Sequence, residues 1–322
     1  MKRKWIRWVS WILLTPIILF VILMVLLYVP PVQNLLRREV TAYASKVTGM
    51  QIQVERIDLR FPLNLLVRGV EVIQQPDTLL SLESLNVRVQ AWPLIKGKVE
   101  VDEVTLSRVA VNSADLMEGM KIKGVLGRFF LQSHGVDLSN ELAVINQVEL
   151  SDTHMQLLMN DTTTTPKDTT ASAPINWKVA LHQLKLKNVS FGMQLPADSM
   201  RMTAHIGEAA INNAQADLKN QYYDLKKFLL SGTSASYDTG TAQPTEGFDA
   251  SHIAVRDIRI ALDSLLYKGR DMNAVIREFT MNERSGLSVT SLTGRAYSND
   301  SVICVPGLKL NTPHSEIDLS AH

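Results

Sequence analysis

The sequence has a single cysteine, Cys304, among its 322 residues. One thiol cannot form a disulfide within the chain, and it cannot supply a cysteine-rich zinc site. Cys304 lies between Ile303 and Val305 in a strand-like run, which is typical of a buried, unreactive thiol rather than a nucleophile. We therefore expect the fold to be stabilised by apolar burial and strand pairing.

The sequence also lacks an excess of charge of either sign. It has 33 basic and 32 acidic side chains, a net charge of +1, whereas a surface that binds nucleic acid needs a basic excess. Apolar residues make up 46% of the chain and charged residues 20%, which is too apolar for a disordered protein. The composition predicts a folded protein that does not bind nucleic acid.

Motifs of common enzymes and cofactor sites are missing as well. None of the seven histidines has the HExxH spacing of a zinc site, and there is no G-x-S-x-G, Walker or GxGxxG motif. Asp161 and Asp168 lack the glycine and glutamate of a calcium loop, which favours a solvated linker over a metal site. We expect no catalytic residue, no metal and no cofactor.

The amino terminus has the pattern of a membrane anchor. Four basic residues precede Trp8, and no charged residue follows until Arg37. Val9 to Val29 would form about 31 Å of helix, which matches a bilayer core, and the positive-inside rule places the first residues in the cytoplasm. The residues expected to hold the anchor at the two membrane interfaces are Lys2, Arg3, Lys4, Trp5, Arg7, Trp8, Trp11 and Tyr28.

A cleaved signal peptide is the alternative. Signal cores have about 7 to 15 apolar residues and end at small residues, whereas this run is longer and is followed by Pro30 and Pro31. A retained anchor is favoured. In a Gram-negative bacterium it would make a single-pass protein of the inner membrane, with a cytoplasmic N-terminus and a body in the periplasm. A lone cysteine suits that oxidising compartment.

Residues 31–49 predict a short amphipathic helix that ends at Gly49. Its apolar residues at helical spacing are Val32, Leu35, Leu36, Val40, Tyr43 and Val47. The helix is either a collar at the membrane surface or the first core helix, which caps the end of a sheet. Both interpretations bury the same apolar face.

Beyond Gly49 the apolar period changes from helical to two, which predicts strands. A six-residue phrase recurs, with an apolar residue, two mostly polar residues, and then apolar, polar and apolar residues. Copies begin at Val54, Val101, Ile145, Leu181 and Val255. Because a regular strand cannot keep apolar residues on one face across a two-residue gap, each copy implies a bulge, and the sheet should be strongly curved. The copies are unevenly spaced, which indicates irregular repeats.

These patterns divide the chain into a cytoplasmic stub and anchor (1–30), an amphipathic helix (31–49) and a β-rich body (50–322). Two segments rich in small polar residues, near 160–174 and 232–250, predict flexible loops within the body. The alternation continues to Leu319, almost at the end of the sequence. Because a sheet that ended there would have an unpaired edge, we expect the natural polypeptide to continue beyond residue 322.

Several segments resemble the amino-terminal region of the AsmA-like superfamily, and within it TamB-type translocation and assembly proteins. They are VERIDLRFPLNLLVRGVEV (Val54 to Val72), DTLLSLESLNVRV (Asp77 to Val89) and PLIKGKVEVDEVTLSRVAVN (Pro93 to Asn112). The segment from Ser285 to Leu319 is similar to TamB-type proteins of Bacteroidetes. The resemblance rests on apolar and polar patterning along most of the chain.

The resemblance implies a mainly β fold, in which the transmembrane helix and the short amphipathic helix precede an elongated, curved, open antiparallel β-groove (β-taco). It implies an inner-membrane protein that moves phospholipid between the inner and outer membranes and contributes to outer-membrane biogenesis. TamB-type chains are several times longer and end in a domain that this sequence lacks. Contact with an outer-membrane β-barrel partner would therefore involve a C-terminal region that is missing here.

The floor of such a groove should consist of the apolar residues of the repeated phrase. The candidates are Val104, Leu106, Val148, Leu150, Leu184, Leu186, Ile258 and Ile260. Two alternatives remain open at this stage. These side chains could fill a closed core, and the protein could be a scaffold or chaperone that pairs its strand edges with outer-membrane proteins during their assembly or secretion.

Overall fold

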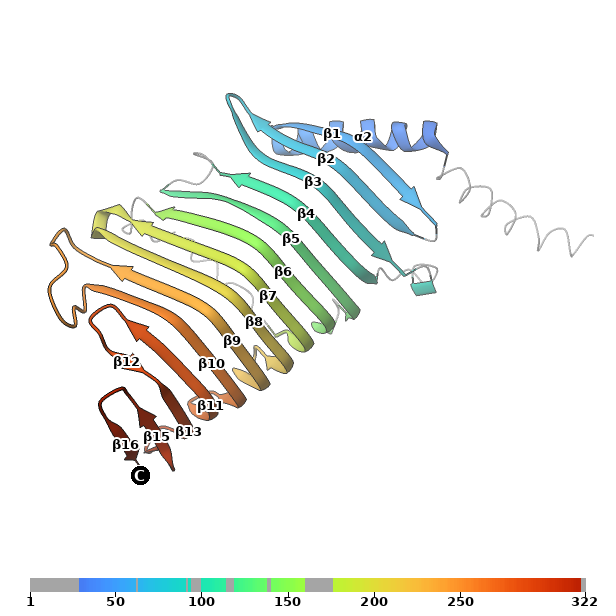
Figure 1. Ribbon diagram of the computed structural model, residues 1–322. Coiled ribbons are helices and arrows are strands. Elements are labelled where there is room, and N and C mark those ends of the chain that lie inside the picture. The colour runs from blue at the N-terminus through green and yellow to red at the C-terminus, as the bar shows by residue number, and fades with distance from the viewer. Residues whose placement is uncertain are drawn as a thin grey trace, which may run out of the picture.

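In the part of the chain that the structure describes, the protein is mainly β, with one α-helix before a long, open sheet of 16 strands (Figure 1). The computed structural model describes residues 29–61, 63–90, 92–93, 100–113, 119–137, 140–159 and 176–319. The elements are α2 (Pro30–Thr48), β1 (Gln51–Arg60), β2 (Asn64–Gln74), β3 (Asp77–Val89), β4 (Val101–Asn112), β5 (Met120–Asp137), β6 (Leu142–Met159), β7 (Lys178–Leu195), the 3-10 turn Pro196–Asp198, β8 (Met200–Asp217), β9 (Tyr222–Asp238), β10 (His252–Lys268), β11 (Asp271–Glu283), β12 (Ser288–Val289), β13 (Ser291–Ser298), β14 (Ile303–Cys304), β15 (Leu308–Asn311) and β16 (Glu316–Leu319).

The strands follow one another across the sheet almost in chain order. The pairs from β1 to β11 are antiparallel except β6 with β7, which run parallel from Leu142 beside Lys178 to Leu158 beside Gln194. The sheet is thus mixed, and the expectation of a wholly antiparallel groove is wrong at this pair. A parallel pair needs a connection of a dozen or more residues, and residues 160–177, between the two strands, meet that requirement.

Helix α2 covers the whole of the predicted amphipathic segment. Pro30 and Pro31 occupy its first turn, where a missing N–H costs nothing, and Gly49 ends it in the left-handed conformation (φ 70°). No helix in the described part of the chain is long and apolar enough to cross a membrane. The predicted anchor and its basic and aromatic flanks fall within residues 1–29, of which only Val29 is described.

A line of bends crosses the middle of the strands. Non-glycine residues in the left-handed conformation mark it on β4, β6, β7 and β10: Arg108, Asp152, Asn188 and Asp257. Asp and Asn tolerate this conformation, and the Asn188 amide donates a hydrogen bond to Oδ1 of Asp152 at 2.8 Å across the parallel pair. The prediction that the two-residue gaps contain bulges is confirmed for the copies on β4, β6 and β10, where the register shifts at the gap. Of the four left-handed residues, only Asp257 lies in a gap, and the other three follow the end of the phrase by two residues.

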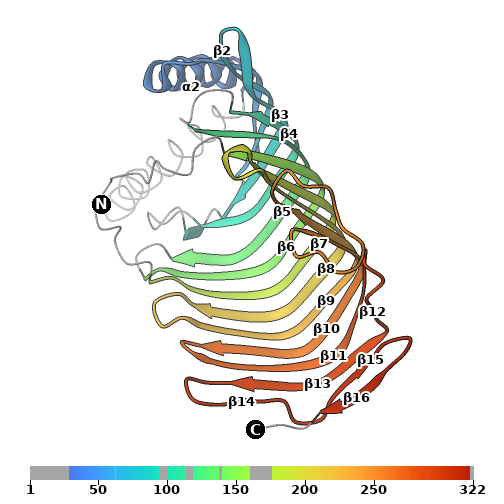
Figure 2. The same cartoon turned by 90° about the vertical axis from the view of Figure 1, so that its left-hand side faces the viewer.

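On β8 and β9, which lie between β7 and β10, glycine residues occupy the line of bends. The chain at Gly207 of β8 lies so close to β9 that a Cβ there would come within 2.8 Å of the carbonyl oxygen of Gly232. Gly232 itself has φ 59°. The bends turn every long strand in the same direction, and the sheet is C-shaped in profile (Figure 2).

The sheet has no second layer over it in the part of the chain that the structure describes. Large, fully buried side chains are absent from this part. The buried apolar residues there are Leu79, Ala143, Ala209, Ala261, Ala274 and Val289. Most apolar side chains are instead half-buried, because their strand neighbours flank them and nothing stacks on them. A closed core built from the repeated phrase is therefore not seen among the described residues.

The two predicted loops have different outcomes. Residues 160–174, which include Asp161 and Asp168, lie outside the described residues. The second loop is shorter than predicted, because β9 continues through Gly232 to Asp238 and the loop spans residues 239–251. The small residues of Gly232 to Ser236 belong to the bend and the strand after it, where close packing against β8 requires them.

The close approach of β8 to β9 at the bend predicts that alanine substitutions of two glycines on neighbouring strands differ in their effect on stability. Gly207→Ala should lower the free energy of unfolding by about 1 to 3 kcal/mol, because its Cβ would press on the backbone of β9. Gly192→Ala should change it by less than about 0.5 kcal/mol, because no heavy atom lies within 3.7 Å of the new Cβ. Urea unfolding measures both. Equal losses would show that the bend is not tightly packed.

Candidate functional site: an apolar face across eleven strands

Two rows of apolar side chains cross the sheet from β1 to β11. In the first, each residue is the cross-strand partner of the next, and every member is apolar. Row 1 consists of Ile57, Val67, Leu85, Leu106, Phe129, Leu150, Leu186, Ala209, Leu230, Ile260 and Phe279. Directly paired residues point to the same side of a sheet, so row 1 lies on one face.

The second row lies two residues along each strand from β1 to β10 and therefore on the same face. On β11 the step is three residues, because the register with β10 shifts between Ala261 and Leu262. Row 2 consists of Leu59, Leu65, Val87, Val104, Leu131, Val148, Leu184, Ile211, Phe228, Leu262 and Ile276. We call the surface formed by rows 1 and 2 the apolar face. Since neighbouring strands are about 4.8 Å apart, ten steps from β1 to β11 make it about 48 Å long.

Seven of the eight residues predicted for a groove floor lie in these rows. Leu106, Leu150, Leu186 and Ile260 are in row 1, and Val104, Val148 and Leu184 are in row 2. Ile258 is in neither row, because it pairs with Thr233 beside the bend. Strand β10 runs opposite to β4, β6 and β7, so along β10 the bend comes before the two apolar rows. The row 2 position that we predicted for Ile258 is therefore occupied by Leu262.

Sequence reasoning missed the members of rows 1 and 2 on β5, β8 and β9. They include Phe129, Leu131, Ile211, Phe228 and Leu230. None of the five copies of the repeated phrase lies on these strands; β5 and β8 run opposite to β4, β6 and β7, whereas β9 runs in the same direction. The signal that would have found them is simple alternation, as in Phe129 and Leu131.

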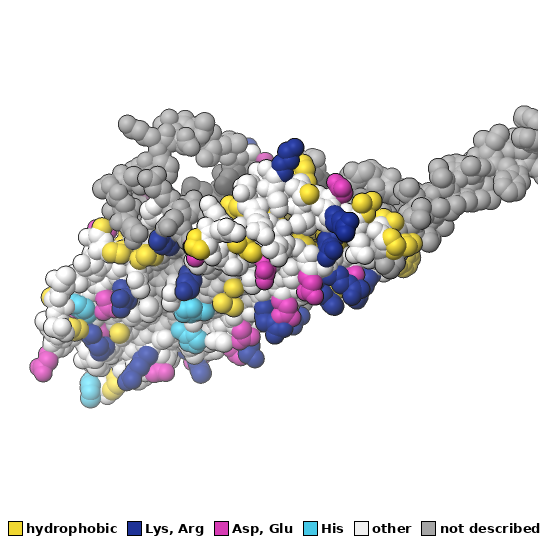
Figure 3. Space-filling model, turned by 90° about the horizontal axis from the view of Figure 1, so that it is seen from above, with side chains coloured by type: hydrophobic (Ala, Val, Ile, Leu, Met, Phe, Trp, Pro, Cys, Tyr) yellow, Lys and Arg dark blue, Asp and Glu magenta, His cyan; other side chains and the backbone are white. Residues whose placement is uncertain are grey.

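The opposite face of the sheet carries charged and hydroxyl side chains, with apolar residues such as Leu66, Phe130 and Leu229 among them. The row next to row 1 on that face contains Arg56, Arg68, Ser84, Ser107, Arg128, Ser151, Lys187, Glu208 and Ser231. Cross-strand ion pairs join Arg88 to Glu103 at 3.1 Å and Lys185 to Glu149 at 3.9 Å. Figure 3 shows acidic and basic side chains side by side along one margin of the molecule. One side of the sheet is thus suited to water and the other to hydrocarbon.

Two histidines line a shallow depression beyond the bend. His205 Nδ1 is 2.9 Å from the hydroxyl oxygen of Ser190, and the amide of Gln156 lies 3.1 Å from Nε2 of His154. The depression has a volume of about 380 Å³ and includes Gly192. The part of the chain that the structure describes has no cluster of three or more His, Cys, Asp or Glu residues that could hold a metal. Cys304 is half-buried and free rather than fully buried.

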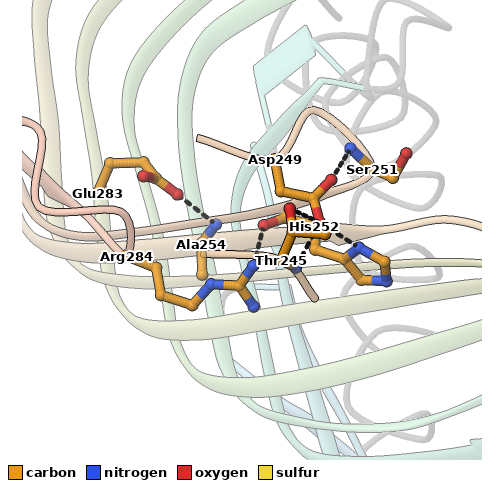
Figure 4. A network of polar contacts seen from close by, with 7 residues as sticks. All are labelled: Thr245, Asp249, Ser251, His252, Ala254, Glu283 and Arg284. Atoms are coloured by element: carbon orange, nitrogen blue, oxygen red, sulfur yellow. Dashed lines mark hydrogen bonds and ion pairs between the residues drawn. The ribbon is translucent and has the colours of Figure 1, made fainter. Parts of the chain in front are cut away.

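A polar network ties the loop 239–251 to the sheet (Figure 4). The Asp249 carboxylate accepts hydrogen bonds from the backbone N–H groups of Thr245 at 3.1 Å and Ser251 at 2.9 Å, and it lies 3.0 Å from Nδ1 of the buried His252. The hydrogen bond from Thr245, followed by that from Ser251, lowers the pKa of Asp249 to about 2. The guanidinium of Arg284, directly after β11, donates to the carbonyl of His252, the first residue of β10, at 2.8 Å.

Helix α2 packs on β1 through polar side chains. Gln33 donates to the carbonyl of Leu59 at 3.1 Å, Arg37 donates to the carbonyl of Glu55 at 2.7 Å, and the Ser45 hydroxyl accepts the N–H of Ile52 at 3.1 Å. The helix does not turn its apolar residues towards the sheet, as the core-helix alternative expected, because Leu35, Tyr43 and Val47 are exposed. The outer edge of β1 has unpaired backbone groups, and their need for hydrogen bonds decides which side of the helix faces the sheet.

No protein-family model matches this chain, and no curated protein sequence matches it. The resemblance to AsmA-like proteins therefore rests on the sequence segments alone. Rows 1 and 2 can shield hydrocarbon from water over a length of several strands. Their side chains carry no polar group that could take part in a reaction.

The network at Asp249 predicts an acid-sensitive loop. Because the pKa of this carboxyl is lowered from 3.8 to about 2, its stabilisation is fully present above pH 3.8 and is lost as the pH falls towards 2. Hydrogen exchange at residues 245–252 should increase across this range, relative to the exchange of β9. Asp249→Asn should remove the pH dependence, whereas Asp198→Asn, outside the network, should retain it. Identical profiles for the protein and Asp249→Asn would contradict this assignment.

Proposed function

We propose that this chain is a membrane-anchored β-groove protein that shields the acyl chains of phospholipids during their transfer between two membranes. The observation that carries the proposal is the pair of uninterrupted apolar rows, 1 and 2. They cross eleven strands on one face, and each of the predicted floor residues in them is half-buried rather than sealed in a core. In this proposal the protein contributes binding and shielding, and no catalytic step.

The energetics favour hydrocarbon as the ligand of the apolar face. Removing a methylene from water is worth about 0.8 kcal/mol, so an acyl chain gains several kcal/mol when only part of its length lies against the rows. An open face about 48 Å long also allows an acyl chain to move from strand to strand while it stays in contact with apolar side chains. Monomeric proteins rarely leave an apolar surface of this extent exposed unless it binds something.

The curvature of the sheet adds to this argument. We propose that rows 1 and 2 form the inner wall of the C-shaped profile seen in Figure 2. Members of the neighbouring polar row, such as Arg128, Lys187 and Glu208, are exposed, whereas the members of row 1 on the same strands are not. This difference is expected when polar residues lie on the convex side and apolar residues on the concave side.

The cellular setting of the proposal comes from the sequence. Residues 9–29 would anchor the chain in the inner membrane of a Gram-negative cell, with the sheet in the periplasm. We propose that the chain is an AsmA-like protein of the TamB type, acting in phospholipid transport and outer-membrane biogenesis. The lone cysteine and the absence of a basic excess are consistent with a periplasmic body that does not bind nucleic acid.

Site-specific cross-linking in cells tests the proposal on the full chain. A benzophenone amino acid at Leu106 or Leu150, in row 1, should form adducts with phospholipid that mass spectrometry detects. The same amino acid at Ser107 or Ser151, the adjacent positions on the polar face, should form few or none. Lipid adducts of equal yield from both faces, or none from row 1, would refute lipid shielding. Adducts of row 1 with other proteins instead would favour the scaffold or chaperone function.

A charge within the apolar face should interrupt the path. Leu150→Glu should reduce lipid adducts formed at row 1 positions on one side of β6 several-fold, because a carboxylate in contact with an acyl chain loses its hydration. Ser151→Glu adds the same charge on the polar face and should leave adduct formation unchanged. Circular dichroism should show the same strand content for both variants. Unaltered cross-linking in Leu150→Glu would exclude movement of lipid along row 1.

A further inference from the structure

We propose that helix α2 is a second membrane contact, lying flat in the headgroup region of an anionic bilayer with the side that faces away from the sheet. This inference rests on the proposed membrane anchor and concerns a different surface from rows 1 and 2. The surface, here the α2 stripe, consists of Leu35, Val40, Tyr43 and Val47. Their side chains are 58%, 52%, 72% and 66% exposed.

The orientation of the helix is determined by its polar side. Gln33, Arg37, Thr41 and Ser45 recur every four residues and therefore form one column along the helix. Three of them hydrogen-bond to backbone groups of β1, and the fourth, Thr41, is half-buried with its hydroxyl oxygen shielded from solvent. These contacts occupy the outer edge of β1 from Ile52 to Leu59, so they hold α2 along most of its length.

The α2 stripe is directed away from the sheet by simple helical geometry. Leu35, Tyr43 and Val47 each follow a member of the polar column by two residues, which is about 200° around a helix. A helix of a water-soluble protein normally turns this side towards a core. Here the polar side of α2 hydrogen-bonds to the backbone of β1, and no described part of the chain covers its apolar side.

A bilayer is the partner that suits this surface. The stripe begins at Leu35, six residues after the end of the apolar run from Val9 to Val29. A bilayer therefore lies within a few residues of the helix if the run spans it. The helix carries three basic residues, Arg37, Arg38 and Lys46, and one acidic residue, Glu39, so its net charge favours anionic lipid. Interfacial helices insert such a side about 5 to 10 Å into the headgroup region.

This placement has a consequence for the apolar face. Rows 1 and 2 begin on β1 at Ile57 and Leu59, the strand against which α2 packs. A helix is about 10 Å in diameter, so a flat α2 would hold the start of both rows about one helix diameter above the bilayer surface. The sheet would then extend away from the membrane, and lipid leaving the bilayer would meet the apolar face at its first strand.

Fluorescence depth measurements on the full chain test the proposal. Cys304→Ser removes the native thiol, and Tyr43→Cys or Val47→Cys then introduces a single site for an environment-sensitive fluorophore. The control is Arg38→Cys, an exposed position about 140° around the helix from Tyr43. Each protein is reconstituted into vesicles of neutral and anionic phospholipid in equal parts, with and without a lipid that carries a spin label near the headgroup. Every variant keeps residues 1–29, so all are attached to the vesicles alike.

The spin-labelled lipid should quench fluorophores at positions 43 and 47 several-fold more strongly than one at position 38. Equal quenching at the three positions, or quenching at neither 43 nor 47, would overturn the proposal. All three positions are exposed and make no contact with β1 in the polar column, so the fold should tolerate each label, and circular dichroism checks this. Because the readout is depth in the bilayer, it can fail while lipid cross-linking at row 1 succeeds, and the reverse also holds.

Discussion

The structure depends on keeping apolar side chains on one face of a sheet while its strands bend. Alternation alone would transfer them to the other face at each two-residue gap. Left-handed residues on β4, β6, β7 and β10, together with the glycines of β8 and β9, absorb the extra residue at the bend. Rows 1 and 2 lie together on one side of this bend, between the two-residue gap and the left-handed residue on β4, β6 and β7, and they form the surface on which the proposed function rests.

A single-layer sheet must also satisfy its two edges and its two faces without a second layer. Cross-strand ion pairs and hydroxyl groups stabilise the polar face in contact with water. At the first edge, α2 uses Gln33, Arg37 and Ser45 to satisfy the backbone of β1. Satisfying the edge leaves the apolar side of the helix exposed, and two apolar surfaces, on the helix and on the sheet, therefore share one end of the molecule.

The loop after β9 shows how a polar segment becomes part of such a sheet. It has no apolar layer to pack against, and its composition predicted a flexible excursion. Asp249 nevertheless organises it by accepting hydrogen bonds from two backbone N–H groups and contacting His252, while Arg284, directly after β11, donates to the carbonyl of His252. Networks of this kind depend on partners that are distant in sequence, so composition is a poor guide to them.

The sequence by itself determined the class of fold, the amphipathic helix, the presence of bulges and the placement of seven of the eight candidate residues on one face, because these follow from local periodicity. Only the tertiary structure decided the parallel pairing of β6 and β7, the register that replaces Ile258 by Leu262, and the direction in which α2 points. Each of these depends on which strand lies beside another and on which way it runs. Pairing of this kind is set by hydrogen bonds between segments far apart in the chain, which a local pattern of apolar residues does not encode.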